Sequence, residues 1–597
     1  MYTQQFLSNF KQYSIHFSLR QSLSLLTMFL IPAALFYLTE AYTHNPFETM
    51  LFCIQLLNIL FFELVMLVGF FLFGSGRIAL LVQTLLFAGI GLANYFVIEF
   101  RSAPIMPWDL LSLTTAASVA DNYSYRLDTR AVLVLLGFLL CFLLSLTCKT
   151  NSKSLRIRLT GTVVSLILLL SFVNYIPSKD CLYRFRLYDK LFTPTTMTYK
   201  DGTAVAFCMQ LPFLFVEEPK GYSIAYAEEL LWKYNKKEQP TRNPDIIVVM
   251  NEAFSDLNLL SDIPVSEDYI PFVRSLLKGA DNTRSGYLHV SVLGGNTANT
   301  EYEYLTGQSM AFLPQGSIPY QQYLKQETLS LPSHLKDAGY RTVAIHPYGA
   351  NGWQRNQVYP RLGFDQFLSL ADFQNGEKIR KYISDKAGYD RIIRLLEEKP
   401  DDTPWFVFYV TMQNHSSYTE EFDNFIPDIK VDGSEDPALS QYLSLLKVSD
   451  REIQALISHF EQREEDTLIV FFGDHQPTDS VIRDINSKNN RSFTDPSHEE
   501  QCLRYQVPFF IWANYELDEA SGLHLSPNHL GSLTLEAAGQ PLSPFHQFLE
   551  ELRQSFPVIS AIEVRDAAGN SYEFREKAEE LQDYSILQYY LLMEEDK

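Results

Sequence analysis

Four apolar segments of the chain end in residues that could carry out chemistry. The residues are Glu252 after segment 246–250, His346 after 342–345, His415 shortly after 405–410, and Asp474 with His475 after 468–472. A strand that ends at the protein surface meets water, which explains Asn or Ser at such positions. It explains much less well why Glu, His and Asp follow all four of these segments. We therefore predict that these strand ends contribute to one shared site.

Glu252, Asp474 and His475 could bind a metal ion together. Carboxylate and imidazole ligands suit Zn or Mn. Taken singly, Glu252 could be an acid at a helix N-terminus, and Asp474 with His475 could be an ordinary loop. Gly473, which precedes the pair, permits a tight backbone turn. As a set of three, the residues favour a metal site.

A hydroxyl group that could act as a nucleophile follows two glycines. The segment 294–301 reads Gly-Gly-Asn-Thr-Ala-Asn-Thr-Glu and precedes a predicted helix. The glycines let the backbone approach a ligand, and a free helix N-terminus attracts an anion. A metal ion could ionise the Thr297 hydroxyl for nucleophilic attack, and Thr300 is a rival for the same role. The alternative is a capping box, with Thr297 as N-cap and Glu301 in the first turn.

The segment that follows His346 could hold an anionic group. It contains Trp353 and Arg355. Arginine can grip a phosphate or sulfate through two parallel hydrogen bonds. Tryptophan offers a flat face to a sugar or a glycerol, or it packs in the core. Neither residue is specific by itself.

The elements that must position these residues follow an alternating pattern. Continuous apolar strands alternate with helix-like stretches at 329–338, 385–399 and 439–461. This alternation is typical of an α/β domain with a mostly parallel sheet. Ligands of such sheets bind outside the carboxyl ends of the strands. We assign this domain to residues 241–597.

The first part of the chain has a different composition. Residues 1–176 hold ten Lys and Arg and seven Asp and Glu, a net charge of +3, so the rest carries −25 of the total of −22. This part contains apolar runs of the length that spans a bilayer, near residues 22–41, 50–73, 78–98, 131–148 and 159–176. One such run could be a buried helix of a soluble protein, but five in succession predict a transmembrane domain. Prolines punctuate residues 177–240, which we interpret as a connector.

The distribution of basic residues predicts the orientation in the cell membrane. The basic residues before the first run and in the second and fourth loops are Lys11, Arg20, Arg77, Lys149, Lys153, Arg156 and Arg158. All seven fall on one side, which is cytoplasmic by the positive-inside rule. A multi-pass protein with five spans and a cytoplasmic N-terminus then has its large domain outside the cell. The acidity of that domain excludes a broad nucleic-acid binder, because phosphates need Lys and Arg.

The motifs together resemble a known family. They appear in this order: Asn251-Glu252, Gly295-Asn-Thr297-Ala-Asn-Thr-Glu301, His346-Pro-Tyr, Trp353-Gln-Arg355, Asn414-His415 and Gly473-Asp474-His475. The pattern is similar to the lipoteichoic acid synthase and phosphoglycerol transferase branch of the alkaline phosphatase/sulfatase superfamily. The five apolar runs and Pro107-Trp108-Asp109-Leu110 between the third and fourth are similar as well. The resemblance covers nearly the whole chain.

The resemblance implies a fold, a chemistry and a site. It implies a five-helix transmembrane bundle followed by an extracellular sulfatase-like domain. One divalent metal ion, commonly manganese with Mg²⁺ or Zn²⁺ as alternatives, would be bound by Glu252, Asp474, His475 and the nucleophile Thr297. The residues around the phosphate would be Trp353, Arg355 and His415, and we expect His346 to line the same pocket.

The resemblance also implies the substrates. Such enzymes take glycerol phosphate from phosphatidylglycerol through a phospho-threonine and pass it to a glycan or a polyglycerol-phosphate acceptor. Segment 297–301 lacks the Cys/Ser-x-Pro-x-Arg pattern of sulfatases, which argues against that activity. The alternatives are a phosphodiesterase or phosphatase, a phosphoethanolamine transferase, and a non-catalytic membrane receptor or scaffold. The stretch 301–310 is more similar to enzymes that decorate a glycan with single glycerol phosphates, which argues against polymer synthesis.

Overall fold

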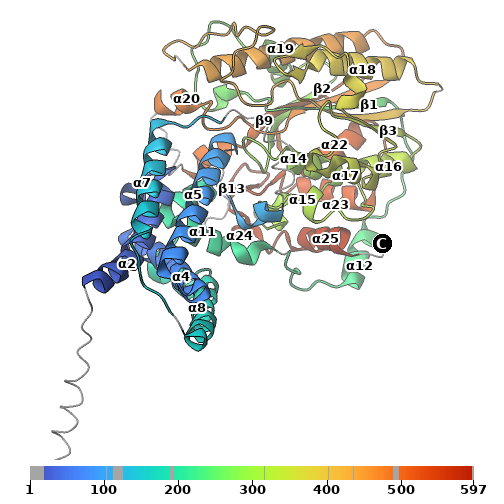
Figure 1. Ribbon diagram of the computed structural model, residues 1–597. Helices are drawn as coiled ribbons and strands as arrows, with labels where there is room; N and C mark the ends of the chain where they lie inside the picture. The colour runs from blue at the N-terminus through green and yellow to red at the C-terminus, as the bar shows by residue number, and fades with distance from the viewer. Residues whose placement is uncertain are drawn as a thin grey trace, which may run out of the picture. The chain divides into compact units, whose positions relative to one another are not determined.

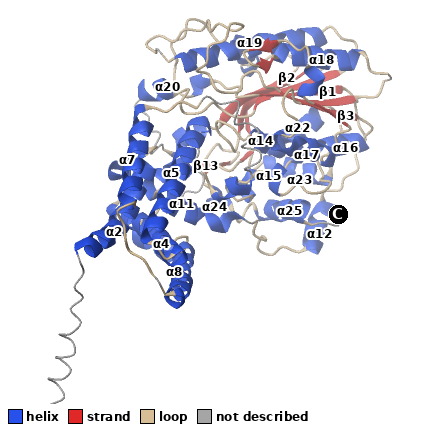
Figure 2. Ribbon diagram, in the orientation of Figure 1, coloured by secondary structure: helices blue, strands red, loops and turns tan. Residues whose placement is uncertain are grey.

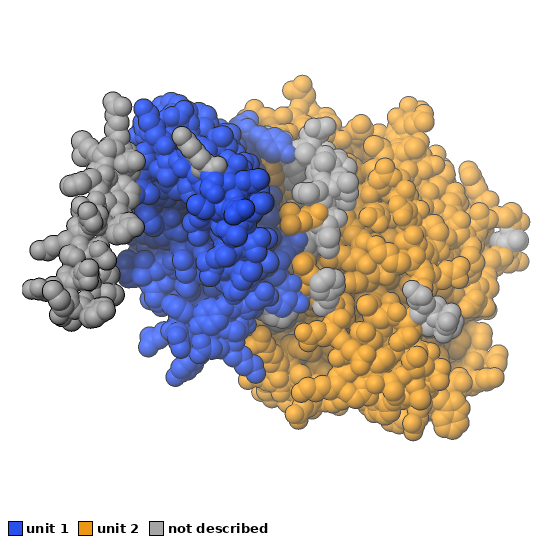
Figure 3. Space-filling view, turned by 60° about the horizontal axis from the view of Figure 1, so that its bottom comes forward, with its two compact units in different colours: residues 1–98, 103–107, 125–212 blue, residues 99–102, 108–124, 213–597 orange. Residues whose placement is uncertain are grey.

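The computed structural model of the chain divides into two compact units. It describes residues 19–101, 104–111, 125–152, 154–188, 194–214, 216–314, 316–400, 402–434, 436–488 and 497–594. Unit 1 comprises residues 1–98, 103–107 and 125–212, and unit 2 comprises residues 99–102, 108–124 and 213–597 (Figure 3). The segment 177–240, predicted as a connector, is thus shared between the units and divides at residue 212.

Unit 1 is built from long apolar helices. They are α2 (Leu19–Ala41), α4 (Phe52–Phe73), α5 (Gly76–Arg101), α7 (Thr129–Ser145) and α8 (Leu155–Tyr175). Within the described residues, α2, α4, α5 and α8 contain apolar stretches long enough to cross a membrane. Helix α7 has 17 residues, about 25 Å of helix, which is shorter than a bilayer core of about 30 Å. The predicted run 131–148 therefore forms a helix that ends three residues early.

Short helices after α8 attach to this bundle. They are α9 (Lys179–Phe185), α10 (Pro194–Asp201) and α11 (Thr203–Gln210). The Asn58 amide in α4 donates to the Asp201 backbone carbonyl at 2.7 Å, and its side-chain oxygen accepts from the Val205 backbone at 3.3 Å. The Glu40 carboxylate in α2 accepts from the Thr203 backbone N–H at 2.8 Å, which satisfies a free donor at the start of α11. Buried polar contacts therefore fix these helices against unit 1.

Unit 2 contains the predicted sheet. Its eight strands are β1 (Asp245–Asn251), β2 (Thr283–His289), β3 (Arg341–Ile345), β4 (Gln366–Leu368), β7 (Trp405–Val410), β8 (Thr467–Gly473), β9 (Gln506–Ala513) and β10 (Ala520–Leu525). They lie in the order β10-β2-β9-β8-β1-β7-β3-β4. Strand β9 runs antiparallel to both of its neighbours, and the other neighbouring pairs are parallel. The α/β domain with a mostly parallel sheet, predicted from the sequence, is confirmed.

Helices cover both faces of the sheet (Figures 1 and 2). One face packs against α13 (Pro271–Leu277), α18 (Asp385–Glu397) and α19 (Pro437–Phe460), and the other against α14 (Thr297–Thr306), α16 (Leu331–Asp337), α17 (Arg355–Arg361) and α22 (Pro527–Ala537). Strand β1 shows why the strands are continuously apolar. Ile247 and Val249 enter the first core, whereas Ile246 and Val248 enter the second, because successive side chains point to opposite faces.

Smaller elements complete unit 2. A three-stranded sheet is formed by β11 (Val558–Ile559), β12 (Val564–Arg565) and β13 (Ser571–Tyr572). Among the described residues, the other α-helices of this unit are α12 (Ile224–Lys233), α15 (Pro319–Gln322), α20 (Arg483–Lys488), α21 (His498–Leu503), α23 (Pro544–Arg553), α24 (Phe574–Lys577) and α25 (Gln582–Met593). Helices α12 and α25 pack on α23 around a separate apolar cluster.

Candidate active site and metal centre

The strand order brings the predicted strand ends together. Strands β3, β7, β1 and β8 are consecutive neighbours and run parallel, so their carboxyl ends lie along one edge of the sheet. Each of these strands is followed by one of the predicted site segments. The backbone N–H of Glu252, after β1, donates to the Thr411 hydroxyl, after β7, at 3.0 Å. The segments that the sequence scatters over more than 120 residues therefore form one edge.

Glu252, Asp474 and His475 are the group that could hold a metal ion. Each offers one ligand atom, and these atoms all lie within 4.8 Å of one another. His475 Nε2 lies 3.7 Å from Glu252 Oε1 and 3.3 Å from Asp474 Oδ2. All three side chains are buried. The grouping that the residue types suggested is thus present in the fold.

Hydrogen bonds orient the side chains of Asp474 and His475 and leave one polar atom of each side chain without a partner. Asp474 Oδ1 accepts from the backbone N–H groups of Ala253 at 2.7 Å and His475 at 2.8 Å. His475 Nδ1 donates to the Gln476 carbonyl at 2.9 Å, which puts the ring proton on Nδ1. The remaining atoms, Asp474 Oδ2 and His475 Nε2, are buried without a hydrogen-bond partner. A divalent cation would satisfy these two buried acceptors, which lie beside the Glu252 carboxylate.

The electrostatics of the group also fit a cation. Burial raises the pKa of the Glu252 carboxyl well above its ordinary value, and the neighbouring Asp474 adds to the effect. Burial likewise raises the pKa of Asp474. Two carboxylates held together away from water disfavour ionisation unless positive charge lies between them. Carboxylate and imidazole donors suit Mn²⁺ or Zn²⁺, so the residues present fit the predicted metal ion.

Thr297 lies beside this group, at the first turn of α14. Its side chain lowers the pKa of both Glu252 and Asp474, which places it beside the two carboxylates. Asn296 is the N-cap residue, has a left-handed backbone with φ of 62°, and makes no side-chain capping bond. The alternative that Thr297 is the N-cap of a capping box is therefore wrong. The Thr297 hydroxyl is directed to the candidate metal ligands instead.

Thr300 has a different role from Thr297. Its hydroxyl donates to the Asp474 backbone carbonyl at 2.8 Å, and the side chain is fully buried. This bond ties α14 to the end of β8. The structure thus favours Thr297 over Thr300 as the hydroxyl that is available for chemistry.

The two predicted histidines are neutral in this arrangement. His346 Nδ1 donates to the Val410 carbonyl at 3.0 Å, and burial lowers the pKa of His346 well below its ordinary value. His415 Nδ1 donates to the Ser416 carbonyl at 2.9 Å. Desolvation lowers the pKa of His415 to about 4, and the nearby His475 acts in the same direction. In the His346 ring the nitrogen that remains is Nε2.

Arg355 is present at the site but is already partnered. Its buried guanidinium forms a fork with the Glu301 carboxylate, through Nε at 3.1 and 3.3 Å and through Nη2. Arg355 also lowers the pKa of Glu252 through its charge, so the two side chains interact electrostatically. Trp353, two residues earlier, is half-buried against the core on the α14 side and has a left-handed backbone with φ of 54°. The structure records no bond between Trp353 and the predicted metal ligands.

Sequence reasoning missed a buried arginine beneath the site. Arg380 donates to the backbone carbonyls of Gln413 at 2.9 Å, His415 at 2.6 Å and Ser417 at 2.7 Å. It therefore fixes the loop that carries His415. No sequence signal identified it, because Arg380 lies in an irregular segment 35 residues before its partner His415.

A polar network under the strand ends was missed as well. The Asp385 carboxylate accepts from Asn251 at 2.9 Å and from Ser449 at 2.6 Å, and Asn414 donates to both Asn251 and Ser449. The network joins β1, β7, α18 and α19. It fixes the backbone from which Glu252 and His415 project.

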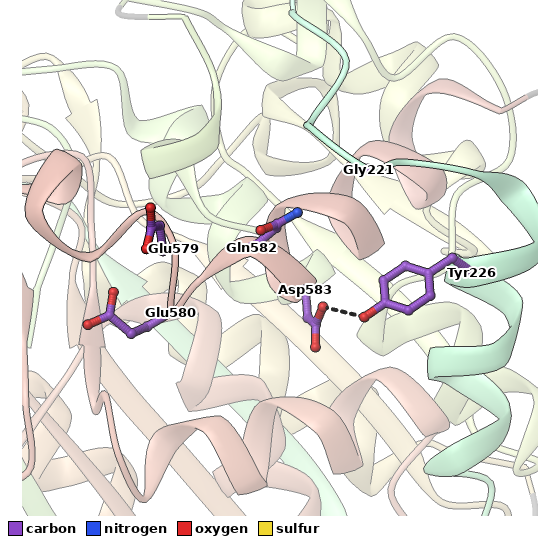
Figure 4. Close-up of a pocket in the computed structure, with 6 residues that line it drawn as sticks. All are labelled: Gly221, Tyr226, Glu579, Glu580, Gln582 and Asp583. Carbon is purple, nitrogen blue, oxygen red and sulfur yellow. Dashed lines mark hydrogen bonds between the residues drawn. The ribbon is translucent and has the colours of Figure 1, made fainter.

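A separate surface pocket lies between α12 and α25. It has a volume of about 320 Å³ and is lined by Gly221, Tyr226, Glu579, Glu580, Gln582 and Asp583 (Figure 4). The Tyr226 hydroxyl donates to the Asp583 carboxylate at 2.9 Å. Glu579 and Glu580 are exposed. None of the predicted site residues lines this pocket, so it is distinct from the strand-end site.

Comparison with known proteins agrees with this fold. The sulfatase family matches residues 244–539. A putative cyclic β-1,2-glucan modification protein of Rhizobium meliloti (strain 1021) is 30% identical over 415 residues, which are 68% of this chain and 63% of that protein. Lipoteichoic acid synthase 1 of Bacillus subtilis (strain 168) is 22% identical over 347 residues, which are 56% of this chain and 51% of that protein. The chain thus spans less than two thirds of the length of these relatives.

Solved structures share the fold. The phosphoglycerol transferase GacH of Streptococcus pyogenes, in complex with sn-glycerol-1-phosphate, matches with a TM-score of 0.52 and 23% identity, over 64% of this chain and 96% of that chain. The lipooligosaccharide phosphoethanolamine transferase A of Neisseria meningitidis, an integral membrane protein, matches with a TM-score of 0.50 and 13% identity, over 86% of this chain and 95% of that chain.

Proposed function

Because the chain belongs to the lipoteichoic acid synthase and phosphoglycerol transferase family of the alkaline phosphatase/sulfatase superfamily, we propose that it is a membrane-bound transferase of glycerol phosphate. The donor is phosphatidylglycerol, and the acceptor is a cell-envelope glycan or a teichoic acid. The observation that carries the proposal is the position of the Thr297 hydroxyl, which lies beside two buried carboxylates of a group that fits a divalent cation and lowers their pKa values.

Glu252, Asp474, His475 and the Thr297 hydroxyl would hold one divalent metal ion, with Mn²⁺ as the first candidate. Such an ion lowers the pKa of a hydroxyl and neutralises charge on phosphoryl oxygens. The three side chains are buried, which keeps water from competing with the substrate. His475 keeps its proton on Nδ1 and presents Nε2 as the ligand atom.

Thr297 is the proposed nucleophile. Its Oγ forms a bond with the phosphorus of the donor, the bond from phosphorus to the lipid oxygen breaks, and diacylglycerol leaves with a proton. The glycerol phosphate remains on Thr297. A hydroxyl of the acceptor then attacks the same phosphorus, takes the glycerol phosphate and restores the threonine.

Arg355 and His415 are the proposed contacts to the phosphoryl oxygens. Arg355 offers guanidinium N–H groups that Glu301 does not use. His415 is neutral without substrate, since its pKa is about 4. A bound phosphate brings negative charge that raises the pKa of the ring and favours a proton on Nε2. His346 lines the same edge with its own Nε2 free, and Trp353 is the proposed surface for the glycerol group.

The proposed location follows from the donor. Phosphatidylglycerol is a membrane lipid, and unit 1 has helices that are long and apolar enough to hold the protein in the cell membrane. The basic residues of the N-terminal part favour a cytoplasmic N-terminus and an extracellular unit 2. A glycan acceptor agrees with the name of the Rhizobium meliloti relative, a putative cyclic β-1,2-glucan modification protein.

Two other activities use the same residues. A hydrolase would use water in place of the acceptor hydroxyl, and a phosphoethanolamine transferase would use another lipid headgroup. The likeness to phosphoethanolamine transferase A along 86% of the chain supports only a shared fold. A non-catalytic receptor or scaffold would not need a hydroxyl beside orphaned buried acceptors, so this alternative has least support.

The test is lipid cleavage by the full chain in detergent. The protein is incubated with fluorescent phosphatidylglycerol and Mn²⁺, and release of diacylglycerol is measured for the wild type, Thr297→Ala and Thr300→Ala. We expect release by the wild type and Thr300→Ala, and none by Thr297→Ala. Mass spectrometry of acid-quenched wild type should find the glycerol phosphate increment on the peptide that contains Thr297.

The outcomes separate the candidates. Cleavage of phosphatidylethanolamine in place of phosphatidylglycerol would support the phosphoethanolamine transferase. Free glycerol phosphate that forms even with glycans present would support the hydrolase. Absence of cleavage by the metal-loaded wild type would exclude the proposed transferase, and equal cleavage by Thr297→Ala would exclude Thr297 as the nucleophile.

A further inference from the structure

One fully buried acid in the site is not among the candidate metal ligands. Glu301 is fully buried in α14, four residues after Thr297. Residues four apart in a helix lie on the same face, one turn from each other. Glu301 therefore faces the same edge of the sheet as the Thr297 hydroxyl.

The Glu301 carboxylate accepts hydrogen bonds from Arg355 and Tyr359. It accepts from Arg355 Nε and Nη2, and its second oxygen also accepts from the Tyr359 hydroxyl at 2.7 Å. Arg355 and Tyr359 are one turn apart in α17. Glu301 therefore binds α17 at two points one turn apart and fixes this helix against α14.

The geometry of the fork decides which part of Arg355 is left for a ligand. A guanidinium has five N–H groups arranged in a plane. Glu301 occupies the edge formed by Nε and Nη2, so Nη1 and the outer hydrogen of Nη2 form the remaining edge. Arg355 is buried, so rotation of the guanidinium toward water is not available as an alternative. The free edge is thus held in one orientation.

The backbone before Arg355 needs such an anchor. Trp353 and Gln354 both have left-handed backbones, with φ of 54° and 60°, although neither is glycine. Such conformations persist only when surrounding contacts impose them. The contacts of Glu301 with Arg355 and Tyr359 begin immediately after this turn.

We infer that Glu301 is the positioning residue that fixes Arg355 relative to the Thr297 nucleophile, so that the free guanidinium edge meets the phosphoryl group attached to or approaching Thr297. This inference rests on the proposed function and deepens it. Glu301 also cancels the charge of Arg355, so Arg355 acts through oriented hydrogen bonds rather than through net charge. Helix α14 thus carries the nucleophile Thr297 and also orients Arg355, which binds the phosphoryl group.

A double-mutant cycle tests this role. The variants are Glu301→Gln, Arg355→Gln and the double variant, in the full chain loaded with Mn²⁺. Binding of glycerol phosphate is measured by calorimetry, and cleavage of phosphatidylglycerol is measured separately. We expect Arg355→Gln to weaken glycerol phosphate binding by about 10- to 100-fold, because it removes charged hydrogen bonds. We expect about a 10-fold loss for Glu301→Gln. The double variant should match Arg355→Gln within about threefold, because Glu301 acts only through Arg355.

Glu303→Gln is the matched control. Glu303 is a second fully buried acid in α14, and its carboxylate accepts from Ser291 and Met310 rather than from Arg355. This control should leave glycerol phosphate binding unchanged. Mn²⁺ affinity should stay within about threefold in Glu301→Gln, which general damage to α14 would not allow, because Thr297 lies on the same helix.

Loss of Glu301 leaves a buried arginine without its partner, which can unfold a protein. If Glu301→Gln does not fold, Tyr359→Phe replaces it in the cycle, since this change removes one hydrogen bond to the same carboxylate and keeps its charge. We then expect a loss of about 2- to 5-fold in the wild-type background and none beside Arg355→Gln.

The outcomes are distinct from those for the proposed function. Losses that multiply in the double variant would overturn the role of Glu301 as a partner of Arg355. An Arg355→Gln variant that binds glycerol phosphate normally would overturn it too, because nothing would remain to be positioned. A wild type that binds glycerol phosphate and cleaves no lipid would instead exclude the proposed transferase, while the binding cycle would still report on Glu301.

Discussion

Replacing Asp474 with asparagine should make the metal-free protein more stable than the wild type. With Mn²⁺ bound, the wild type should be the more stable of the two. The two backbone N–H groups of Ala253 and His475 require an oxygen at the position of Oδ1. The amide nitrogen must then take the position of Oδ2, 3.3 Å from His475 Nε2. There it can donate to a nitrogen that has no partner in the wild type. The variant thus fills the cation position with an N–H group.

The magnitude follows from the two changes. The new hydrogen bond contributes about 1 kcal/mol. Removing one of two buried carboxyls with raised pKa values acts in the same direction, because it relieves the repulsion between them. In EDTA we therefore expect Asp474→Asn to be more stable than the wild type by about 1 kcal/mol, an increase of about 1–2 °C in Tm.

Bound Mn²⁺ should make the wild type more stable than Asp474→Asn. Mn²⁺ at about 100 times its Kd stabilises a protein that binds it by about 2.7 kcal/mol, and the variant should gain nothing. The assay is thermal unfolding of the full chain in detergent, in EDTA and in Mn²⁺. Asp385→Asn is the control, because Asp385 is a buried acid with a raised pKa of about 6 that is not among the candidate metal ligands. Its shift should be the same in both conditions.

Two results would refute this reasoning. Stabilisation of Asp474→Asn by Mn²⁺ equal to that of the wild type would show that Asp474 is not a ligand. A lower Tm than the wild type in EDTA would show that the metal-free carboxyls are not in conflict, and the electrostatic argument for a cation at this position would fail.

Three further predictions concern neighbouring residues. Thr300→Val should lower the free energy of unfolding by about 1–3 kcal/mol, because the buried Asp474 carbonyl loses its donor, yet lipid cleavage should persist. Burial raises the pKa of Glu303 from 4.5 to about 8, so the free energy of unfolding should fall as pH rises through this range, by up to about 1.4 kcal/mol per pH unit. Glu303→Gln should remove that slope in unfolding measurements at several pH values. An unchanged slope would contradict the raised pKa of Glu303. Arg380→Lys should reduce lipid cleavage about 10-fold without changing Mn²⁺ affinity in calorimetry, because lysine cannot hold three carbonyls of the His415 loop at once.

The sequence determined the kind of protein and most of the metal group. Long apolar runs in the first part and short apolar runs in the second part are local features, and each reflects the environment that its own residues require. Glu252, Asp474 and His475 could be grouped because each directly follows a strand. Parallel strands end at the same edge, so position along the chain translates into position in space.

The sequence could not reveal the strands that lack an apolar run. Strand β2 contains Arg284, Ser285 and Gly286, and the adjacent β10 is partly exposed, so neither shows a continuous apolar pattern. Their pairing partners lie far away in the chain. The antiparallel direction of β9 likewise depends on these neighbours rather than on its own residues.

Only the tertiary structure decided between the roles of similar side chains. Thr297 and Thr300 lie in the same helical turn, and the sequence treats them alike, but packing directs one hydroxyl to the carboxylates and the other to a backbone carbonyl. Glu301 looked like a capping residue and proved to be the partner of Arg355, 54 residues away. The physical reason is that hydrogen bonds between distant segments depend on distances of about 3 Å, which the order of residues along the chain does not specify.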